Sequence, residues 1–103
     1  MANIEPAIKE KIQPKTGLTP PSLLNVIYIK DETTTMEFVI ASLVEVFNHS
    51  NEEAATLCAK IHEDGMAVVA VLPYEMAEQK GVEATVMARN NGFPLLIRLE
   101  PVA

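Results

Sequence analysis

Residues 23–39 read LLNVIYIKDETTTMEFV, and the character of the chain changes twice within this stretch. Residues 23–29 are apolar and rich in β-branched side chains, which is typical of a strand covered on both faces. Three threonines precede Met36, where the hydroxyl of Thr35 can cap a helix and Glu37 adds negative charge at the positive end of the helix dipole. The stretch therefore predicts a strand, a polar turn and the start of a helix.

The rest of the chain carries the signals of two more helices and two more strands. Ser50 and Glu53 form the pattern of a capping box, and Gly65 stands where a helix commonly ends. A proline marks the end of each of the two later strands. Proline has no backbone N–H to donate to a hydrogen bond between strands. The predicted elements are a strand at 23–29, helices at about 35–49 and 50–64, a strand at 66–72 ended by Pro73, a helix at 74–90 weakened by Gly81, and a strand at 95–99 ended by Pro101.

The order strand, helix, helix, strand, helix, strand predicts an α+β two-layer domain with helices on one face of a three-stranded sheet. Both helical connections are too long for hairpins, so we expect crossovers. The apolar positions of the last helix are Met76, Ala77, Val82, Val86 and Met87.

The 103 residues have the size of one domain. Residues 1–22 hold four prolines and no sustained apolar period, so we expect a flexible amino-terminal extension before a core domain at 23–103. The apolar runs are far shorter than the ~20 residues of a membrane span, and the first residues lack a secretory signal. These features predict a soluble, cytoplasmic protein without a membrane partner.

The net charge is −6, from 14 acidic and 8 basic residues. Nucleic-acid binding is not expected, because such proteins cluster lysine and arginine. Residues 1–20 hold three lysines against two glutamates, so the acidic excess belongs to the folded part. The lone Cys58 and two histidines exclude an internal disulfide and a closed four-ligand zinc site, and we expect neither a metal nor a cofactor.

Asp31 and Glu32, at the end of the first strand, are the first candidates for a binding site. A carboxylate there can accept backbone N–H groups at the helix start, or it can bind a cation such as an ammonium group. His62, near the end of the second helix, can bond to free carbonyls of its own helix or accept a hydrogen bond from a ligand amine. The residue types leave both alternatives open at each position.

Apolar residues near these groups either pack a core or line a cavity. The neighbours expected around the loop after the first strand are Met36, Val39, Cys58, Ile61 and Leu95. Cys58 and His62 share a helix face, so with Asp31 they also allow an open three-ligand metal site, a weaker alternative because metal sites usually show more ligands. No nucleophile and base, phosphate loop or paired-glycine motif is evident, so the sequence does not predict an enzyme.

A set of short motifs extends from about Pro21 to Pro101. They are Asp31, the run TTMEFV at 34–39, Ile61-His62 with Gly65, Ala67-Val68, the run EMAEQK at 75–80, and Pro94-Leu95-Leu96 with Leu99-Glu100. In these motifs the chain resembles the ClpS adaptors, which pass proteins with destabilising amino-terminal residues to a Clp-family AAA+ ATPase and its protease. The resemblance implies a fold like that of the C-terminal domain of a ribosomal stalk protein.

By this resemblance, Asp31 and His62 would hold the free α-amino group of the substrate. The first substrate side chain, typically leucine, phenylalanine, tyrosine or tryptophan, would enter an apolar pocket whose shape Met36 limits against β-branched side chains. The corresponding pocket positions are Thr34, Met36, Val39, Cys58, Ile61 and Leu95. Glu75 and Lys80 correspond to positions that contact the amino-terminal domain of the ATPase, which the extension would help to engage or regulate.

Lys30 departs from the family, which usually has an asparagine before Asp31 that helps to hold the substrate amine. A lysine pointing inward would repel that amine or pair with Asp31, whereas a lysine turned outward would leave the site open. Glu32, Thr33 and Thr35 also replace commoner residues.

The implied function is an adaptor that binds a bulky hydrophobic amino-terminal residue and delivers its bearer for ATP-dependent proteolysis. The alternative is a regulatory module that docks on the ATPase and modulates its substrate choice without reading amino-terminal residues.

Overall fold

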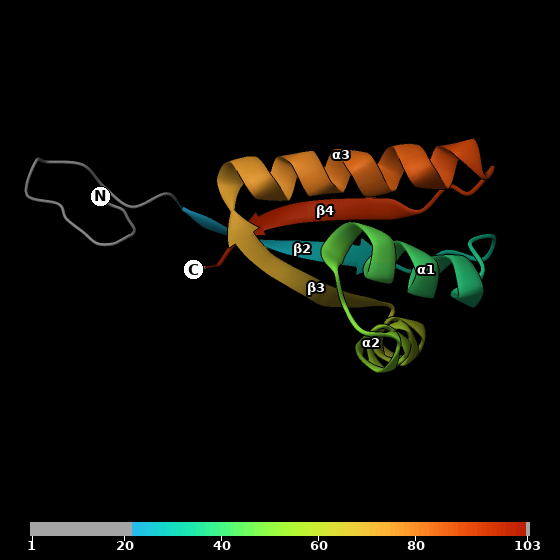
Figure 1. Cartoon of the computed structure of the whole chain (residues 1–103). Coiled ribbons are helices and arrows are strands. Elements are labelled where there is room, and N and C mark those ends of the chain that lie inside the picture. Colours follow the sequence, from blue (N-terminus) through green and yellow to red (C-terminus); the bar gives the residue numbers. More distant parts are fainter. Residues whose placement is uncertain (1–21, 103) are drawn as a thin grey trace, which may run out of the picture.

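The computed structural model describes residues 22–102, and their element order confirms the predicted one (Figure 1). The predicted extension lies outside the described residues apart from Ser22, and so does Ala103. The elements are β2 (Leu23–Ile29), α1 (Met36–Phe47), α2 (Asn51–Asp64), β3 (Met66–Pro73), α3 (Tyr74–Asn90) and β4 (Leu96–Pro101). Within residues 22–102 no helix is long and apolar enough to cross a membrane.

The three strands form an antiparallel sheet in the order β3-β2-β4. Because β3 and β4 both run against the central strand, they are parallel to each other, and α3 joins them as a crossover over β2. The prediction of a crossover through α1 and α2 is wrong, because these helices join β2 and β3, which are neighbouring antiparallel strands. Antiparallel neighbours need only a hairpin, so this two-helix insertion is not required by the sheet.

Strand and helix ends differ from prediction by a few residues. Pro73 and Pro101 are the last residues of β3 and β4 rather than the first residues after them, and both strands lie at sheet edges, where a missing N–H is tolerated. Strand β4 starts at Leu96, one residue later than predicted. Helix α1 ends at Phe47 because Asn48 adopts a left-handed conformation with φ of 61° and donates its N–H to α1 carbonyls.

The helix starts follow the local sequence signals. The Thr35 hydroxyl accepts a hydrogen bond from the Phe38 N–H at 3.1 Å. Ser50 and Glu53 form the predicted capping box, with both hydrogen bonds at 3.0 Å. At the end of α2, Gly65 has φ of 85°, a conformation that favours glycine. These caps set where α1 and α2 begin and where α2 gives way to β3.

The core lies between one face of the sheet and the helices. Val26 and Tyr28 of β2 are completely buried, as is Leu43 of α1, while Met66 and Val68 are exposed on the opposite sheet face. The Tyr28 hydroxyl and the Ser42 hydroxyl form a buried hydrogen bond of 2.8 Å that ties the sheet to α1. Helices therefore cover one face only, as predicted.

Helix α3 packs on the sheet through small side chains. Its buried residues are Ala77, Gly81, Ala84 and Ala88, whereas Val82 and Val86 remain exposed. The sequence marks the larger apolar residues of this helix, but small side chains at four- and three-residue steps allow the helix to approach the strands closely. Gly81 belongs to this packed face, where an added Cβ would lie 3.8 Å from Leu99 Cδ2, so it is a contact position as well as a weak helix former.

Candidate functional site

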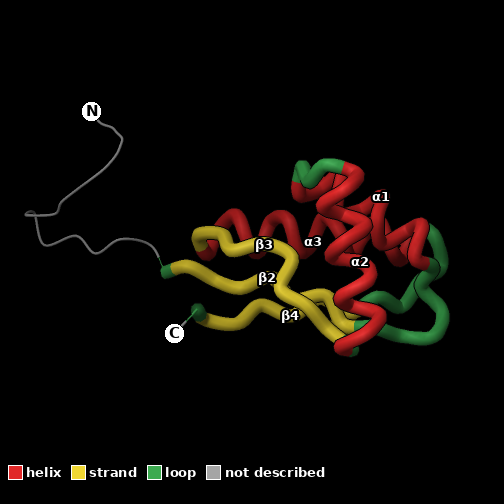
Figure 2. The backbone as a smooth tube through the Cα atoms, turned by 90° about the horizontal axis from the view of Figure 1, so that it is seen from below, coloured by secondary structure: helices red, strands yellow, loops and turns green. Residues whose placement is uncertain are grey.

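One end of the sheet gathers segments that are far apart in the sequence. The end of β2, the first turn of α1, the last turns of α2 and the residue before β4 meet there, at the opposite end of the sheet from the start of β2 and the end of β4 (Figures 1 and 2). They enclose a pocket of about 50 Å³. Its lining includes every residue predicted for the amine site and the apolar pocket: Asp31, Thr34, Met36, Val39, Cys58, Ile61, His62 and Leu95, with Lys30 and the unpredicted Ile29.

Asp31 is the fixed polar group of this pocket. Its Oδ1 atom accepts the N–H groups of Thr33 and Thr34 at 2.8 and 2.7 Å, and its Oδ2 atom accepts the Thr34 hydroxyl at 2.7 Å. These bonds close the turn between β2 and α1, which is the local role the sequence allowed. A carboxylate offers about four lone-pair sites, so acceptor capacity remains for a ligand. The turn thus orients the carboxylate and leaves lone pairs free to accept hydrogen bonds from a ligand.

The surroundings of Asp31 favour its charged form. Burial, the largest single influence, raises the pKa of this carboxyl, but the hydrogen bonds from Thr34 and Thr33 and the charge of Arg89 outweigh it and lower the pKa below its ordinary value. The carboxylate therefore stays ionised throughout the neutral range. An ionised, oriented acceptor beside an apolar cavity suits an ammonium group.

Lys30 and His62 lie at the exposed rim of the pocket. The ammonium of Lys30 donates to the carbonyl oxygen of His62 at 3.2 Å, which directs it to the last turn of α2, where free carbonyls and the helix dipole favour a cation. The backbone N–H of Lys30 also donates to the carbonyl of Gly65 at 2.9 Å. No ion pair between Lys30 and Asp31 is found among residues 22–102. The Lys30 ammonium thus does not pair with the Asp31 carboxylate.

The walls of the pocket are apolar and tightly packed, except at Met36. Val39, Ile61 and Leu95 are almost completely buried, whereas Met36 is 52% exposed. The buried Cys58 thiol donates to the carbonyl oxygen of Met36 at 3.7 Å, and burial raises the pKa of this thiol. Met36 is consequently the apolar lining residue whose side chain is freest to change conformation.

Arg89, near the end of α3, is a residue that sequence reasoning missed. Its Nη1 atom donates to the carbonyl oxygens of Phe93 and Leu95 at 2.9 Å each, and the ring of Phe93 packs edge-on against Phe38 with centroids 5.1 Å apart. The guanidinium therefore holds the segment that presents Leu95 to the pocket. The available signal was a cation in the last turn of a helix, which commonly bonds to carbonyls beyond its end.

Other predicted residues lie elsewhere or do not form a site. Glu75 and Lys80 stand on α3 and do not line the pocket, and the Lys80 ammonium is 3.8 Å from Glu83. Across the described chain, no three His, Cys, Asp or Glu side chains are grouped so that they could hold a metal ion. The arrangement of Asp31, Cys58 and His62 therefore does not support the three-ligand alternative.

Comparison with known proteins places the chain in a family. The family model described as ATP-dependent Clp protease adaptor protein ClpS matches residues 19–98. The chain is 42% identical over 82 residues to the ATP-dependent Clp protease adapter protein ClpS of Treponema denticola, covering 80% of this chain and 81% of the relative. It is 39% identical over 100 residues to that of Shewanella loihica, covering 97% and 95%.

A solved structure gives the same result. The structure of Agrobacterium tumefaciens ClpS2 bound to L-phenylalaninamide matches with a TM-score of 0.77 at 36% sequence identity, over 80% of this chain and 99% of the other. The sequence match and the fold agree, and the chain belongs to the ClpS family of ATP-dependent Clp protease adaptor proteins.

Proposed function

We propose that this chain binds the free amino terminus of proteins that begin with a bulky hydrophobic residue and delivers them to a Clp-family AAA+ ATPase and protease. Asp31 receives the α-ammonium group, His62 accepts a hydrogen bond from one of its N–H groups, and the apolar pocket receives the first side chain. The chain acts in this proposal by binding and not by catalysis, in the cytoplasm where its partners would work. The observation that carries the proposal is the ionised, oriented Asp31 carboxylate beside an apolar pocket.

The ligand of the related structure has the same two chemical features. L-phenylalaninamide carries an α-amino group and an aromatic side chain, and its amide stands in for the peptide bond to a second residue. A protein 36% identical to this chain binds that compound. This supports the assignment of a free amine and a large side chain to the pocket described above.

The pocket must widen to accept such a side chain. Its volume of about 50 Å³ is well below the roughly 150 Å³ of a cavity that holds benzene. Met36 is half exposed and has three rotatable side-chain bonds, so its displacement opens the pocket at little cost in packing. We therefore assign to Met36 the role of an adaptable wall.

We expect a peptide that begins with phenylalanine to bind this protein roughly 10 to 100 times more tightly than the same peptide beginning with glycine. Burying a large apolar side chain contributes about 1.5 to 3 kcal/mol, and each 1.4 kcal/mol is a factor of ten. Fluorescence anisotropy with labelled peptides measures both affinities. Equal affinities for the two peptides would show that the pocket does not receive the first side chain.

Delivery requires a second surface, which we place on α3. Glu75 is exposed in the first turn of that helix and Lys80 follows five residues later, and neither lines the pocket. A partner bound to these residues would leave the substrate site accessible. This separation is what an adaptor needs, because substrate and ATPase are held at the same time.

The alternative function is a regulatory module that docks on the ATPase without reading amino-terminal residues, and Lys30 is the feature that favours it. The ammonium of Lys30 is directed to the carbonyl of His62, which argues that the amine site stays open. We therefore expect Lys30→Asn to tighten binding of a phenylalanine-first peptide by no more than about fivefold, because an exposed charge is worth about 0.2 to 1 kcal/mol.

The same anisotropy measurement distinguishes the two functions. Lys60, an exposed lysine on α2 that does not line the pocket, provides a matched control as Lys60→Asn. If the native protein does not bind the peptide and Lys30→Asn does, the regulatory module is the better description.

A further inference from the structure

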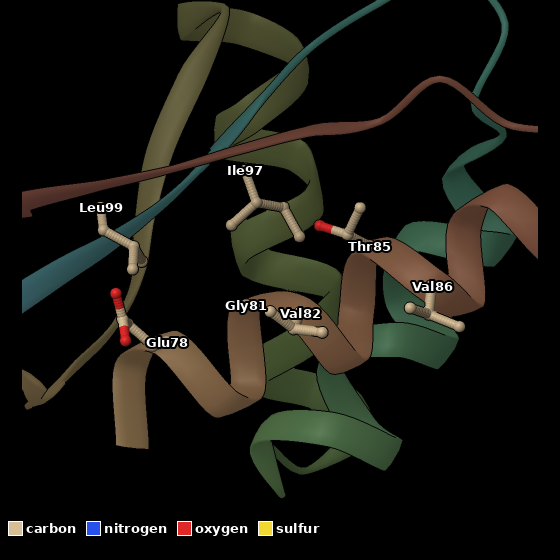
Figure 3. Close-up of a pocket in the computed structure, with 7 residues that line it drawn as sticks. All are labelled: Glu78, Gly81, Val82, Thr85, Val86, Ile97 and Leu99. Atoms are coloured by element: carbon tan, nitrogen blue, oxygen red, sulfur yellow. The ribbon is translucent and has the colours of Figure 1, made fainter. Parts of the chain in front are cut away.

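A second and larger hollow lies between α3 and β4, and it shares no lining residue with the amine site. Its volume is about 420 Å³. Figure 3 shows Ile97 and Leu99 of β4 pointing toward α3, and Val82 on the facing helix. We call this hollow the α3–β4 groove, and its lining residues are Glu78, Gly81, Val82, Thr85, Val86, Ile97 and Leu99.

The groove is an apolar surface left open within the described part of the chain. Val82 is 62% exposed and Val86 is 50% exposed, and only Glu78 and Thr85 contribute polar side chains to the lining. Strand β4 pairs with β2 alone among the described strands, so the outer edge of β4 borders the groove without a neighbouring strand. Such a surface suits an occupant with apolar side chains.

The amino-terminal extension enters the described structure beside the groove. The carbonyl oxygen of Ser22 accepts the N–H of Tyr74, the first residue of α3, at 3.1 Å. The carbonyl oxygen of Leu23 accepts the N–H of Val102, just after β4, at 3.3 Å. The chain thus joins the domain between the start of α3 and the end of β4, which are the two elements that form the groove.

The distances allow the extension to reach the groove. Val82 follows Tyr74 by eight residues, or about 12 Å along a helix. Leu18 precedes Ser22 by four residues, which span up to about 14 Å when extended. Glu78 marks the near end of the groove, and its hydrogen bond and charge raise the pKa of Tyr74, which shows how close its carboxylate lies to the point of entry.

The composition of the extension complements the groove. Residues 8–18 contain Ile8, Ile12 and Leu18 as apolar side chains, and they hold three lysines against a single glutamate. The groove has an apolar floor and a carboxylate at its near end, and α3 also carries the exposed Glu75 and Glu83. Apolar side chains can therefore enter the groove while lysines lie near the acidic residues of the helix.

We propose that the α3–β4 groove is the docking site of the chain's own residues 8–18, with Leu18 against Val82 and the lysines beside the α3 carboxylates. Docking of the extension covers the exposed valines of α3 and places residues 8–18 along the helix that carries Glu75 and Lys80. The proposal concerns a surface separate from the amine site and does not depend on peptide recognition there.

Methyl NMR spectra of the full chain test this docking. We expect Leu18→Asp to shift the methyl signals of Val82, Val86, Ile97 and Leu99, because a charged side chain leaves the apolar groove. The methyl signals of Val68, exposed on the far face of the sheet, serve as the internal control and are expected to stay in place. Unchanged groove signals would overturn the proposal. So would groove signals that depend on protein concentration in the native chain, because they would identify a second copy as the occupant.

Limited digestion of the full chain with trypsin gives a second, independent measurement. Lys9, Lys11 and Lys15 are the cleavage sites in the extension. We expect Val86→Glu to accelerate cleavage there at least threefold, because the docked segment is released. Val71→Glu is the matched control, since Val71 is also 50% exposed but does not line the groove. Equal cleavage rates in both variants and the native chain would overturn the proposal, and if Val86→Glu does not fold, the Leu18→Asp spectra decide alone.

Discussion

Asp31→Asn is expected to weaken binding of a peptide with a free amino terminus and a first phenylalanine at least about thirtyfold. An asparagine oxygen can still accept the N–H groups of Thr33 and Thr34, so the turn before α1 is retained. What is lost is the negative charge that faces the α-ammonium group. Removing one partner of a hydrogen-bonded charge pair at a binding site typically costs about 2 to 5 kcal/mol. Isothermal titration calorimetry of the native and variant proteins measures the change.

Two controls separate the amine contact from general effects of charge. Glu32→Gln removes a negative charge from the exposed neighbour, which does not line the pocket, and is expected to change affinity less than about fivefold. An amino-terminally acetylated peptide lacks the ammonium group, so it is expected to bind weakly to the native protein and to be insensitive to Asp31→Asn. Tight binding of the acetylated peptide would contradict the assignment of Asp31 to the amine.

The protein is expected to lose about 2 to 3 kcal/mol of its free energy of unfolding between pH 10 and pH 12 through Tyr28 alone. Burial raises the pKa of Tyr28 from 10.0 to about 12, against a smaller lowering by the Ser42 hydrogen bond. A pKa raised on folding means that the unfolded chain releases this proton first as the pH rises. The stabilisation is therefore complete below pH 10 and is lost as the pH rises through 12, at about 1.4 kcal/mol for each pH unit.

Urea unfolding of the native protein and of Tyr28→Phe, at pH 8 and at pH 11.5, measures this loss. The variant is expected to be less stable at pH 8 by about 1 kcal/mol, because the Ser42 hydroxyl loses one partner but still donates to the Val39 carbonyl. Its stability should then fall less than that of the native protein at pH 11.5. Tyr74→Phe should retain most of the native loss, because the pKa of this exposed tyrosine is raised chiefly by its neighbour Glu78, and solvent screens that interaction. If Tyr28→Phe loses as much free energy of unfolding at pH 11.5 as the native protein, ionisation of other groups causes the loss.

The local features of this fold were readable from the chain because each depends on residues close in sequence. Thr35 and the pair of Ser50 and Glu53 cap their helices by bonds within three residues, and Gly65 ends a helix through its own backbone freedom. The β-branched run of β2 and the element order are local in the same sense. The fold class followed from these signals together.

Most residues of the pocket were candidates from residue types and pattern alone. The resemblance to a family added Thr34 and the specific roles in binding an amine and a side chain, which remain proposals. Residue types alone left Asp31 as either a helix-start acceptor or a cation site. The structure shows that its carboxylate closes the turn while retaining acceptor capacity beside the pocket. This geometry is compatible with both roles, the helix-start acceptor and the cation site. Residue types alone could not show this, because they do not give the direction of the carboxylate.

Contacts between distant segments were decided only by the tertiary structure. The direction of the Lys30 ammonium depends on a carbonyl 32 residues away, and the position of Leu95 depends on Arg89 in the preceding helix. The buried face of α3 consists of Ala77, Gly81, Ala84 and Ala88, because close approach to the sheet selects small side chains over large apolar ones. The sequence by itself thus determined which elements form and where they are capped, since those interactions are local. The tertiary structure decided which side chains meet, because that depends on how the helices pack on the sheet.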